Sequence, residues 1–177
     1  GVEQRAVRDA AYAAGARQVF LVPSAIAAAI GAGVAIHETR GHFVLSIGAG
    51  STEVAVLALG GVVAGESLRL GGDDFDKAIV GHWIEQNKKD KNAVLEDKSL
   101  SQSLRLKAEE VKMLLTNAPT VERTESGWNL DLDRNTLESL MKPFIDKSIQ
   151  CCKQALADSG LALSQIEKVV LVGGSTR

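Results

Sequence analysis

Several residue types that mark specialised classes of protein are scarce in this sequence of 177 residues. It has two cysteines, 4% aromatic residues, and 20 basic against 22 acidic side chains, which gives a formal net charge of −2. Balanced charge argues against a nucleic-acid-binding or membrane-surface module, since both need an excess of Lys and Arg. Few aromatic residues argue against platforms that stack bases. We therefore expect one globular domain with no nucleic-acid partner and no membrane partner.

The two cysteines and three histidines show no pattern of a disulfide or a metal centre. Cys151 and Cys152 are neighbours in a helical pattern, where adjacent side chains point about 100° apart and do not form an ordinary disulfide. Such a pair fits a reducing compartment, so we expect a cytoplasmic protein. His37, His42 and His82 have no zinc-finger spacing to the cysteines, and the sequence predicts no metal site.

The longest stretch without charge, residues 19–36, just reaches the length of about 18 residues at which a membrane span is considered. Pro23 and Ser24 interrupt it, and mostly Ala and Gly follow. We therefore predict a buried strand at 18–22 and a helix at 25–31, with Ser24 as its N-cap.

The hydrophobic pattern elsewhere alternates between strand and helix periods. Strands are expected at 43–47, 53–59, 62–70 and 168–172, with a hairpin turn at Gly60-Gly61. Helices are expected at 2–14, 73–86 and 100–116, with a small hairpin around Ser126-Gly127 and a long helix from Asp133 to 159. Strands mixed with crossover helices indicate an α/β protein, and a three-strand meander with a later returning strand indicates a mixed sheet.

Glycines directly follow two of the predicted buried strands, in Gly48-Ala49-Gly50-Ser51-Thr52 and Gly173-Gly174-Ser175. Small residues at such places let backbone N–H groups approach a phosphate, although tight turns need glycine for conformation alone. A third glycine loop, Gly71-Gly72-Asp73-Asp74, is expected to begin a helix capped by Asp. No loop has the Walker A or G-x-G-x-x-G pattern.

Three motifs in this order resemble those of the actin-like ATPase superfamily. The run Ser46-Ile47-Gly48-Ala49-Gly50-Ser51-Thr52-Glu53 is similar to its second phosphate loop. Two later runs are similar to DnaK-type heat-shock chaperones, Leu70-Gly71-Gly72-Asp73-Asp74-Phe75-Asp76 and the adenosine-side loop Val172-Gly173-Gly174-Ser175-Thr176-Arg177. Residues 2–33, and the meander up to 70, are most similar to the MreB family of bacterial cytoskeletal proteins.

This resemblance implies an actin-like ATPase (ribonuclease H-like) fold, with a mixed sheet, flanking helices and a small α+β subdomain. Residues 1–33 would form the end of a first lobe and its connecting helix. Residues 34–86 and 133–177 would form the core of the second lobe, and 87–132 an inserted small subdomain. Since Gly1 replaces an initiating Met and Arg177 falls inside the adenosine-side loop, we expect a fragment of a longer protein.

The resemblance also implies two sets of contacts to ATP or ADP. The set facing the β- and γ-phosphates is Gly48, Ala49, Gly50 and Ser51. The set on the ribose and adenine side is Glu109, Lys112, Gly173, Gly174, Ser175 and Arg177. Without the resemblance, Glu109 and Lys112 would be read as a solvated pair at helical spacing.

Two carboxylates of the family pattern are absent. Ser46 stands where the family has the Asp that holds a water of the magnesium ion, and Ser24 stands where it has a Glu before Pro. A neutral hydroxyl positions Mg²⁺ and the attacking water less well than a carboxylate does. No catalytic residue is therefore assigned, and whether the chain is an enzyme stays open.

The resemblance implies a fragment of a DnaK-like chaperone nucleotide-binding domain with impaired hydrolysis. In the parent, ATP or ADP with Mg²⁺ would bind between two lobes and control a substrate-binding domain, which serves client polypeptides and co-chaperones. Two alternatives stay open, an MreB-like filament-forming ATPase and a degenerate, non-hydrolysing scaffold.

Overall fold

The computed structural model describes residues 2–176. Its first elements are α1 (Val2–Ala13), α2 (Ser24–Gly31), β1 (Gly41–Ile47), β2 (Thr52–Ala58), β3 (Gly61–Leu68), α3 (Gly72–Gln86), α4 (Lys91–Glu96) and α5 (Lys98–Leu114). They are followed by β4 (Thr120–Val121), β5 (Thr124–Glu125), β6 (Trp128–Asn129), β7 (Leu132–Asp133), α6 (Arg134–Ser159) and β8 (Ile166–Val172), with short 3₁₀ turns at Leu163–Gln165 and Gly174–Thr176.

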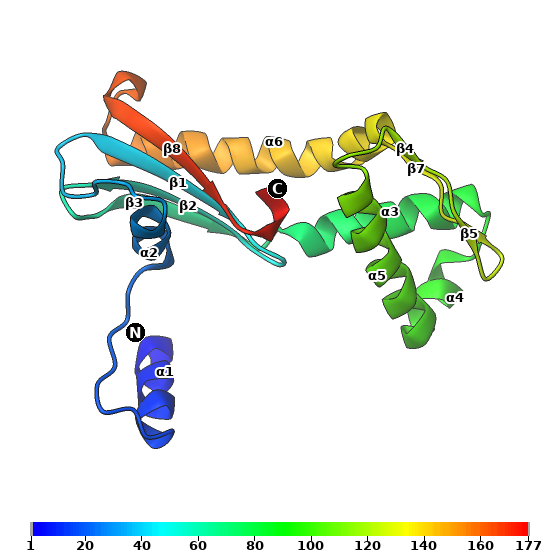
Figure 1. Cartoon of the computed structure of the whole chain (residues 1–177), viewed down its shortest axis with the longest axis horizontal. Coiled ribbons are helices and arrows are strands. Elements are labelled where there is room, and N and C mark those ends of the chain that lie inside the picture. Colours follow the sequence, from blue (N-terminus) through cyan, green and yellow to red (C-terminus); the bar gives the residue numbers. More distant parts are fainter. Residues whose placement is uncertain (1, 177) are drawn as a thin grey trace.

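A four-stranded mixed sheet forms one part of the molecule (Figure 1). Its order is β3-β2-β1-β8, with β1 antiparallel to β2 and parallel to β8. Alternate residues of β1 point to opposite faces. Val44 packs with Ala29 of α2 on one face, and Phe43 packs with Ala155 of α6 on the other. The predicted α/β class, with a mixed sheet and flanking helices, is confirmed.

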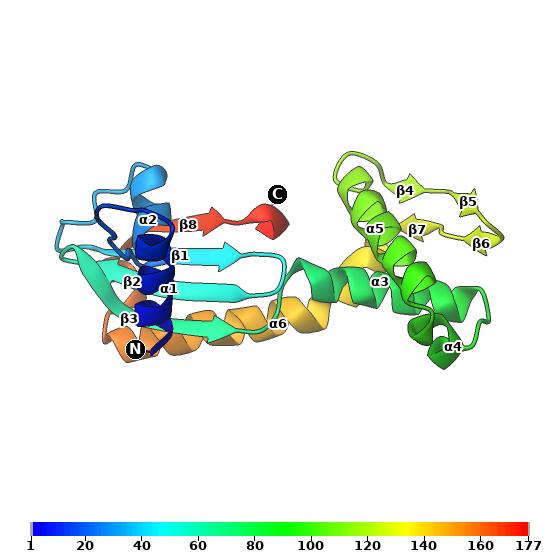
Figure 2. The same ribbon diagram turned by 90° about the horizontal axis from the view of Figure 1, so that it is seen from below.

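A smaller, mainly helical subdomain forms the other part, and α6 runs through both parts (Figures 1 and 2). The core of this subdomain contains side chains from α3, α4, α5, the small β-pairs and the first turns of α6. Trp83 of α3 lies at its centre, and the indole Nε1 donates a hydrogen bond to the Asp131 carbonyl at 3.1 Å. The apolar side of α3 thus packs into this subdomain, although the expected boundaries placed residues 73–86 with the sheet. Those boundaries stay a prediction.

The helix ends of α6 follow from its sequence. The Asp133 carboxylate accepts a hydrogen bond from the backbone N–H of Thr136 at 2.9 Å, which satisfies a donor in the first turn. Gly160 ends the helix in the left-handed conformation, with φ of 68°. Cys151 and Cys152 lie inside α6 as free thiols, as expected.

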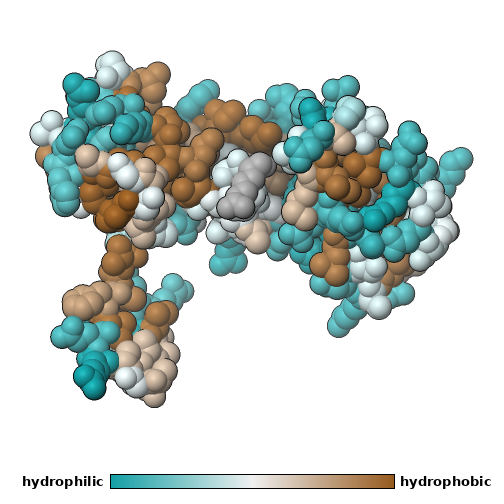
Figure 3. Space-filling view, viewed as in Figure 1, coloured by the Kyte–Doolittle hydropathy of each residue, from teal (hydrophilic) through white to brown (hydrophobic). Residues whose placement is uncertain are grey.

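Residues 18–22 do not form the buried strand that was predicted. They are extended but unpaired, because neither edge of the sheet lies beside them, and Phe20 is 81% exposed. In Figure 3 this link forms an apolar surface between α1 and the sheet. Among residues 2–176, no helix combines the length and the apolar character that a bilayer span requires.

Three local predictions also need correction. Ser24 is the first residue of α2, not its N-cap; Pro23 takes that place, and the Ser24 hydroxyl donates to the Glu53 carboxylate instead. The β2–β3 turn lies at Leu59 and Gly60, which both have positive φ, so β3 starts one residue earlier than expected. The last strand, predicted as buried, is exposed at Val169, because β8 is an edge strand that is covered on the α6 face only at its start, by the packing of Ile166.

The core of the subdomain gives a matched pair of stability variants on α5. Leu104 is 4% exposed and Leu106 is 57% exposed. We expect Leu104→Ala to lower the free energy of unfolding by about 2–5 kcal/mol, because it leaves a cavity in the core. Leu106→Ala should change it by less than about 0.5 kcal/mol. Urea unfolding followed by tryptophan fluorescence measures both, and equal losses would contradict this core.

Candidate nucleotide-binding site

Three glycine loops meet where β1 and β8 end. The first loop connects β1 to β2, the second follows β8, and the third precedes α3. The backbone N–H of Gly72 donates to the Gly48 carbonyl at 2.9 Å, and the N–H of Asp73 donates to the Ala49 carbonyl at 2.7 Å. The Ser175 hydroxyl donates to the same Gly48 carbonyl at 3.2 Å. Two separate segments, one at the start of α3 and one after β8, thus fix the first loop in place.

The approach of these backbones requires glycine at two positions. A Cβ on Gly173 would lie 2.2 Å from the Ile47 carbonyl oxygen, and Gly173 has φ of +102°. A Cβ on Gly71 would lie 2.4 Å from the Ala49 carbonyl oxygen. Both contacts are closer than a side chain tolerates, so these glycines serve the packing of the loops. At Gly50, by contrast, a Cβ would meet nothing within 4 Å.

A cavity of about 640 Å³ opens between these loops and the helical subdomain. Of the residues implied to contact a nucleotide, those that line it are Ala49, Glu109, Lys112, Gly174 and Ser175. Gly48, Gly50, Ser51 and Gly173 lie in the adjoining loops. Arg177, the remaining residue of that set, lies outside the described residues. The structure thus gathers these residues around one cavity, and their contact with a nucleotide stays a prediction.

An ion pair between a buried carboxylate and a half-buried ammonium lies in the wall of this cavity. The Lys112 ammonium lies 2.5 Å from the carboxylate of Asp76, which is 7% exposed. Burial raises the pKa of Asp76, and the nearby Lys112 opposes that rise. Glu109 and Asp73 add like charge and raise the pKa further.

Sequence reasoning missed Asp76 because its partner is 36 residues away. One signal was available. Asp76 shares the helix face of Ile79, Val80 and Trp83, which lie three, four and seven residues on and are all buried. A carboxylate on an otherwise apolar stripe needs a buried partner.

A second carboxylate that the sequence reasoning missed lies at the same end of the sheet. Glu53 of β2 is paired directly with Ser46 of β1, so their side chains share a face. The Ser24 hydroxyl donates to this same carboxylate. The two serines that replace the expected acids therefore both lie beside Glu53. The available signal was an acid placed directly after the first glycine loop.

Substitution of one glycine tests how closely the loops pack. Gly173→Ala is expected to lower the free energy of unfolding by about 1–3 kcal/mol, because the methyl group meets the Ile47 backbone and φ is positive. Gly174→Ala should stay within about 0.5 kcal/mol, since its Cβ would meet nothing within 4 Å. Thermal unfolding compares the two, and equal stability would contradict the close approach.

The ion pair predicts the direction of a pKa change. Lys112→Gln removes the charge that favours ionised Asp76, so the pKa of Asp76 should rise further. Lys77→Gln, which removes a partner of Asp74, should leave the pKa of Asp76 unchanged. Carboxyl ¹³C NMR titration measures both, and an unchanged or lower pKa in Lys112→Gln would refute the pairing.

The raised pKa has a matching effect on stability. The folded state binds the Asp76 proton more tightly than the unfolded state does, because the pKa of Asp76 is raised by folding. The stabilisation that this proton gives to the folded state is fully present below the ordinary pKa of an Asp. It is lost as the pH rises through the raised pKa.

Comparison with known proteins agrees with this architecture. The family model described as "Hsp70 protein" matches residues 1–177. The "Chaperone protein HscA homolog" of Pseudomonas putida is 33% identical over 180 residues, which cover 99% of this chain and 28% of that protein. The corresponding protein of Pseudomonas aeruginosa (strain PAO1) is 36% identical over 180 residues, covering 99% of this chain and 29% of the relative.

A second group of relatives matches a shorter stretch. The "Cell shape-determining protein MreB" of Escherichia coli K12 is 54% identical over 81 residues, covering 46% of this chain and 23% of that protein. The chain thus spans less than a third of the length of these curated relatives. The expected resemblance to both groups is confirmed, and the family model covers the whole chain: the chain belongs to the Hsp70 family.

Proposed function

We propose that this chain is the nucleotide-binding part of an Hsp70-type chaperone and holds ATP or ADP on the three glycine loops. The observation that carries the proposal is the convergence of those loops, with Glu109 and Lys112, around one cavity. Hsp70 membership supports nucleotide as the ligand class. In the full-length protein, the bound nucleotide would control the binding of client polypeptides. Co-chaperones would be further partners, and the protein would lie in the cytoplasm.

The first loop offers donors to the phosphates. Among residues 2–176, the N–H groups of Ala49 and Gly50 donate no hydrogen bond, whereas the N–H of Gly48 is bonded to the Ser51 carbonyl at 2.8 Å. Free backbone donors in a tight loop attract an anion without any cationic side chain. The open space beside Gly50 leaves room for a phosphate to approach.

The helical side of the cavity offers groups to the ribose. Glu109 of α5 is exposed and can accept hydrogen bonds from ribose hydroxyls. Lys112, one turn further on, is held by Asp76, and its ammonium would lie 3.7 Å from a Cβ on Gly72. The ion pair therefore fixes a cation beside the loops.

Serine in place of the expected acid at positions 24 and 46 sets the expected chemistry. The carboxylates that line the cavity, among them Asp73, Asp76 and Glu109, lie on its helical side. Mg²⁺ prefers carboxylate and water oxygens, and of the groups at Ser24, Ser46 and Glu53 only the last is charged. One carboxylate that also accepts a hydrogen bond from Ser24 is a weak holder of Mg²⁺ and of the attacking water. We infer that the chain carries nucleotide and that its hydrolysis is impaired.

Nucleotide titration of the chain tests the proposal. ADP and ATP are expected to bind weakly and without turnover. Glu109→Gln should weaken binding about tenfold, ~1.4 kcal/mol, through the loss of a charged acceptor. Glu122→Gln, an exposed acid in the β4–β5 connection, is the matched control. Calorimetry and phosphate release measure both quantities, and tight binding with magnesium-dependent hydrolysis would contradict impaired hydrolysis.

Restoring the acids tests how the site is aligned. Ser46→Asp with Ser24→Glu should raise the magnesium-dependent affinity for ADP, because two carboxylates return beside the first loop. The same calorimetric titration with Ser99→Asp, an exposed serine of α5, controls for added charge. An unchanged affinity in the double variant would show that these serines do not stand at the magnesium side.

A second candidate is an MreB-like filament subunit, favoured by the 54% identity over 81 residues. Sedimentation of the full-length protein with and without ATP separates the two. Pelleting that depends on ATP would favour the filament, and absence of both pelleting and nucleotide binding would favour a scaffold.

A further inference from the structure

The end of the sheet away from the glycine loops brings together two carboxylates and one imidazole. They belong to Glu38, His42 and Glu167, and one ligand atom of each lies within 4.8 Å of the others. Glu38 precedes β1, His42 is near its start, and Glu167 lies near the start of β8. These residues take no part in the proposed nucleotide site.

Local backbone structure places each of the two acids. The Leu59 N–H donates to the Glu38 carbonyl at 3.0 Å, which ties this segment to the β2–β3 turn. Glu167 is the extra residue of a bulge, because Gly41 pairs with Ile166 and His42 pairs with Lys168. A bulge redirects a side chain that regular alternation would place on the other face.

His42 is the unusual member of this cluster. Its side chain is 1% exposed, and neither Nδ1 nor Nε2 has a hydrogen-bond partner among the described residues. Buried polar atoms in proteins are almost always paired. An unpaired, buried imidazole nitrogen within reach of two carboxylates indicates a ligand that accepts its lone pair.

We propose that Glu38, His42 and Glu167 bind a divalent transition-metal cation, with Zn²⁺ as the best match. One imidazole and two carboxylates form a nitrogen and oxygen donor set of the kind that Zn²⁺ takes. Tetrahedral Zn²⁺ separates its ligand atoms by about 3.3 Å. The rigid, buried His42 would stay in place, and the two exposed glutamates would close onto the ion. Three protein ligands leave a fourth position for water.

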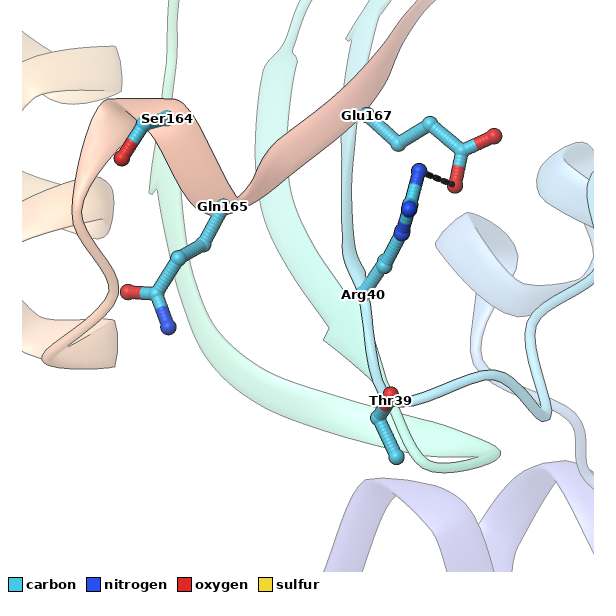
Figure 4. A pocket seen from close by; sticks show the side chains of 5 residues that line it. All are labelled: Thr39, Arg40, Ser164, Gln165 and Glu167. Carbon is cyan, nitrogen blue, oxygen red and sulfur yellow. Dashed lines mark ion pairs between the residues drawn. The ribbon is translucent and has the colours of Figure 1, made fainter.

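Arg40 is the competing cation at this site. Its Nη1 lies 3.7 Å from the Glu167 carboxylate, and its side chain is 70% exposed (Figure 4). A cavity of about 500 Å³, lined by Thr39, Arg40, Ser164, Gln165 and Glu167, exposes the Glu167 carboxylate to solvent, and Glu38 is exposed as well. An ion can therefore enter as the Arg40 side chain turns outward. This competition predicts that removing Arg40 strengthens metal binding.

Calorimetric titration of the 177-residue chain with ZnCl₂ tests the proposal. One Zn²⁺ per chain is expected, with at least tenfold weaker binding in Glu38→Gln and in Glu167→Gln. Arg40→Gln should bind several-fold more tightly, and Glu85→Gln, an exposed acid of α3, should bind as the unchanged chain does. The substituted residues are all exposed, so the variants are expected to fold.

The imidazole provides an independent readout. Zn²⁺ should shift the ring ¹⁵N resonance of His42 and leave those of His37 and His82 in place. Absence of binding at millimolar Zn²⁺ would overturn the proposal. So would binding that survives both glutamate variants but is lost in Cys151→Ser with Cys152→Ser.

Discussion

The backbones that follow β1 and β8 approach each other so closely that no side chain fits between them. A Cβ on Gly173 would lie 2.2 Å from the Ile47 carbonyl oxygen, and one on Gly71 would lie 2.4 Å from that of Ala49. Because of this approach, the start of α3 is bonded directly to the β1–β2 loop. The helical subdomain is thereby held at the end of the sheet where β1 and β8 finish, and the cavity forms between them.

Sequence periodicity was sufficient for elements whose signals are local. The caps of α6, Asp133 and Gly160, and the turn at Ser126 and Gly127 are read from neighbouring residues. The strand predicted at 18–22 was wrong, because a strand needs a partner that an apolar run does not supply. Ser24 similarly illustrates the limit, since its hydroxyl bonds to an acid 29 residues away and not to its own helix.

The candidate site likewise has parts that follow from local sequence and parts that depend on long-range contacts. Its glycine loops are visible in the sequence because each follows a strand directly, and the family resemblance supplied Glu109 and Lys112. The pairing of Lys112 with Asp76 and the position of Glu53 beside two serines depend on long-range contacts. These contacts determine which charged groups face the site. The structure therefore adds Glu53 as a carboxylate beside the two serines, which the sequence pattern did not identify.

The central claim is that nucleotide binds where the glycine loops meet the helical subdomain. Amide chemical-shift mapping by NMR, with ADP added to the ¹⁵N-labelled chain, tests it most directly. Shifts are expected in the 48–51 and 173–175 loops and around Glu109 and Lys112, with the β2–β3 turn unaffected. Shifts confined to the opposite end of the sheet, or none at millimolar ADP, would contradict the claim.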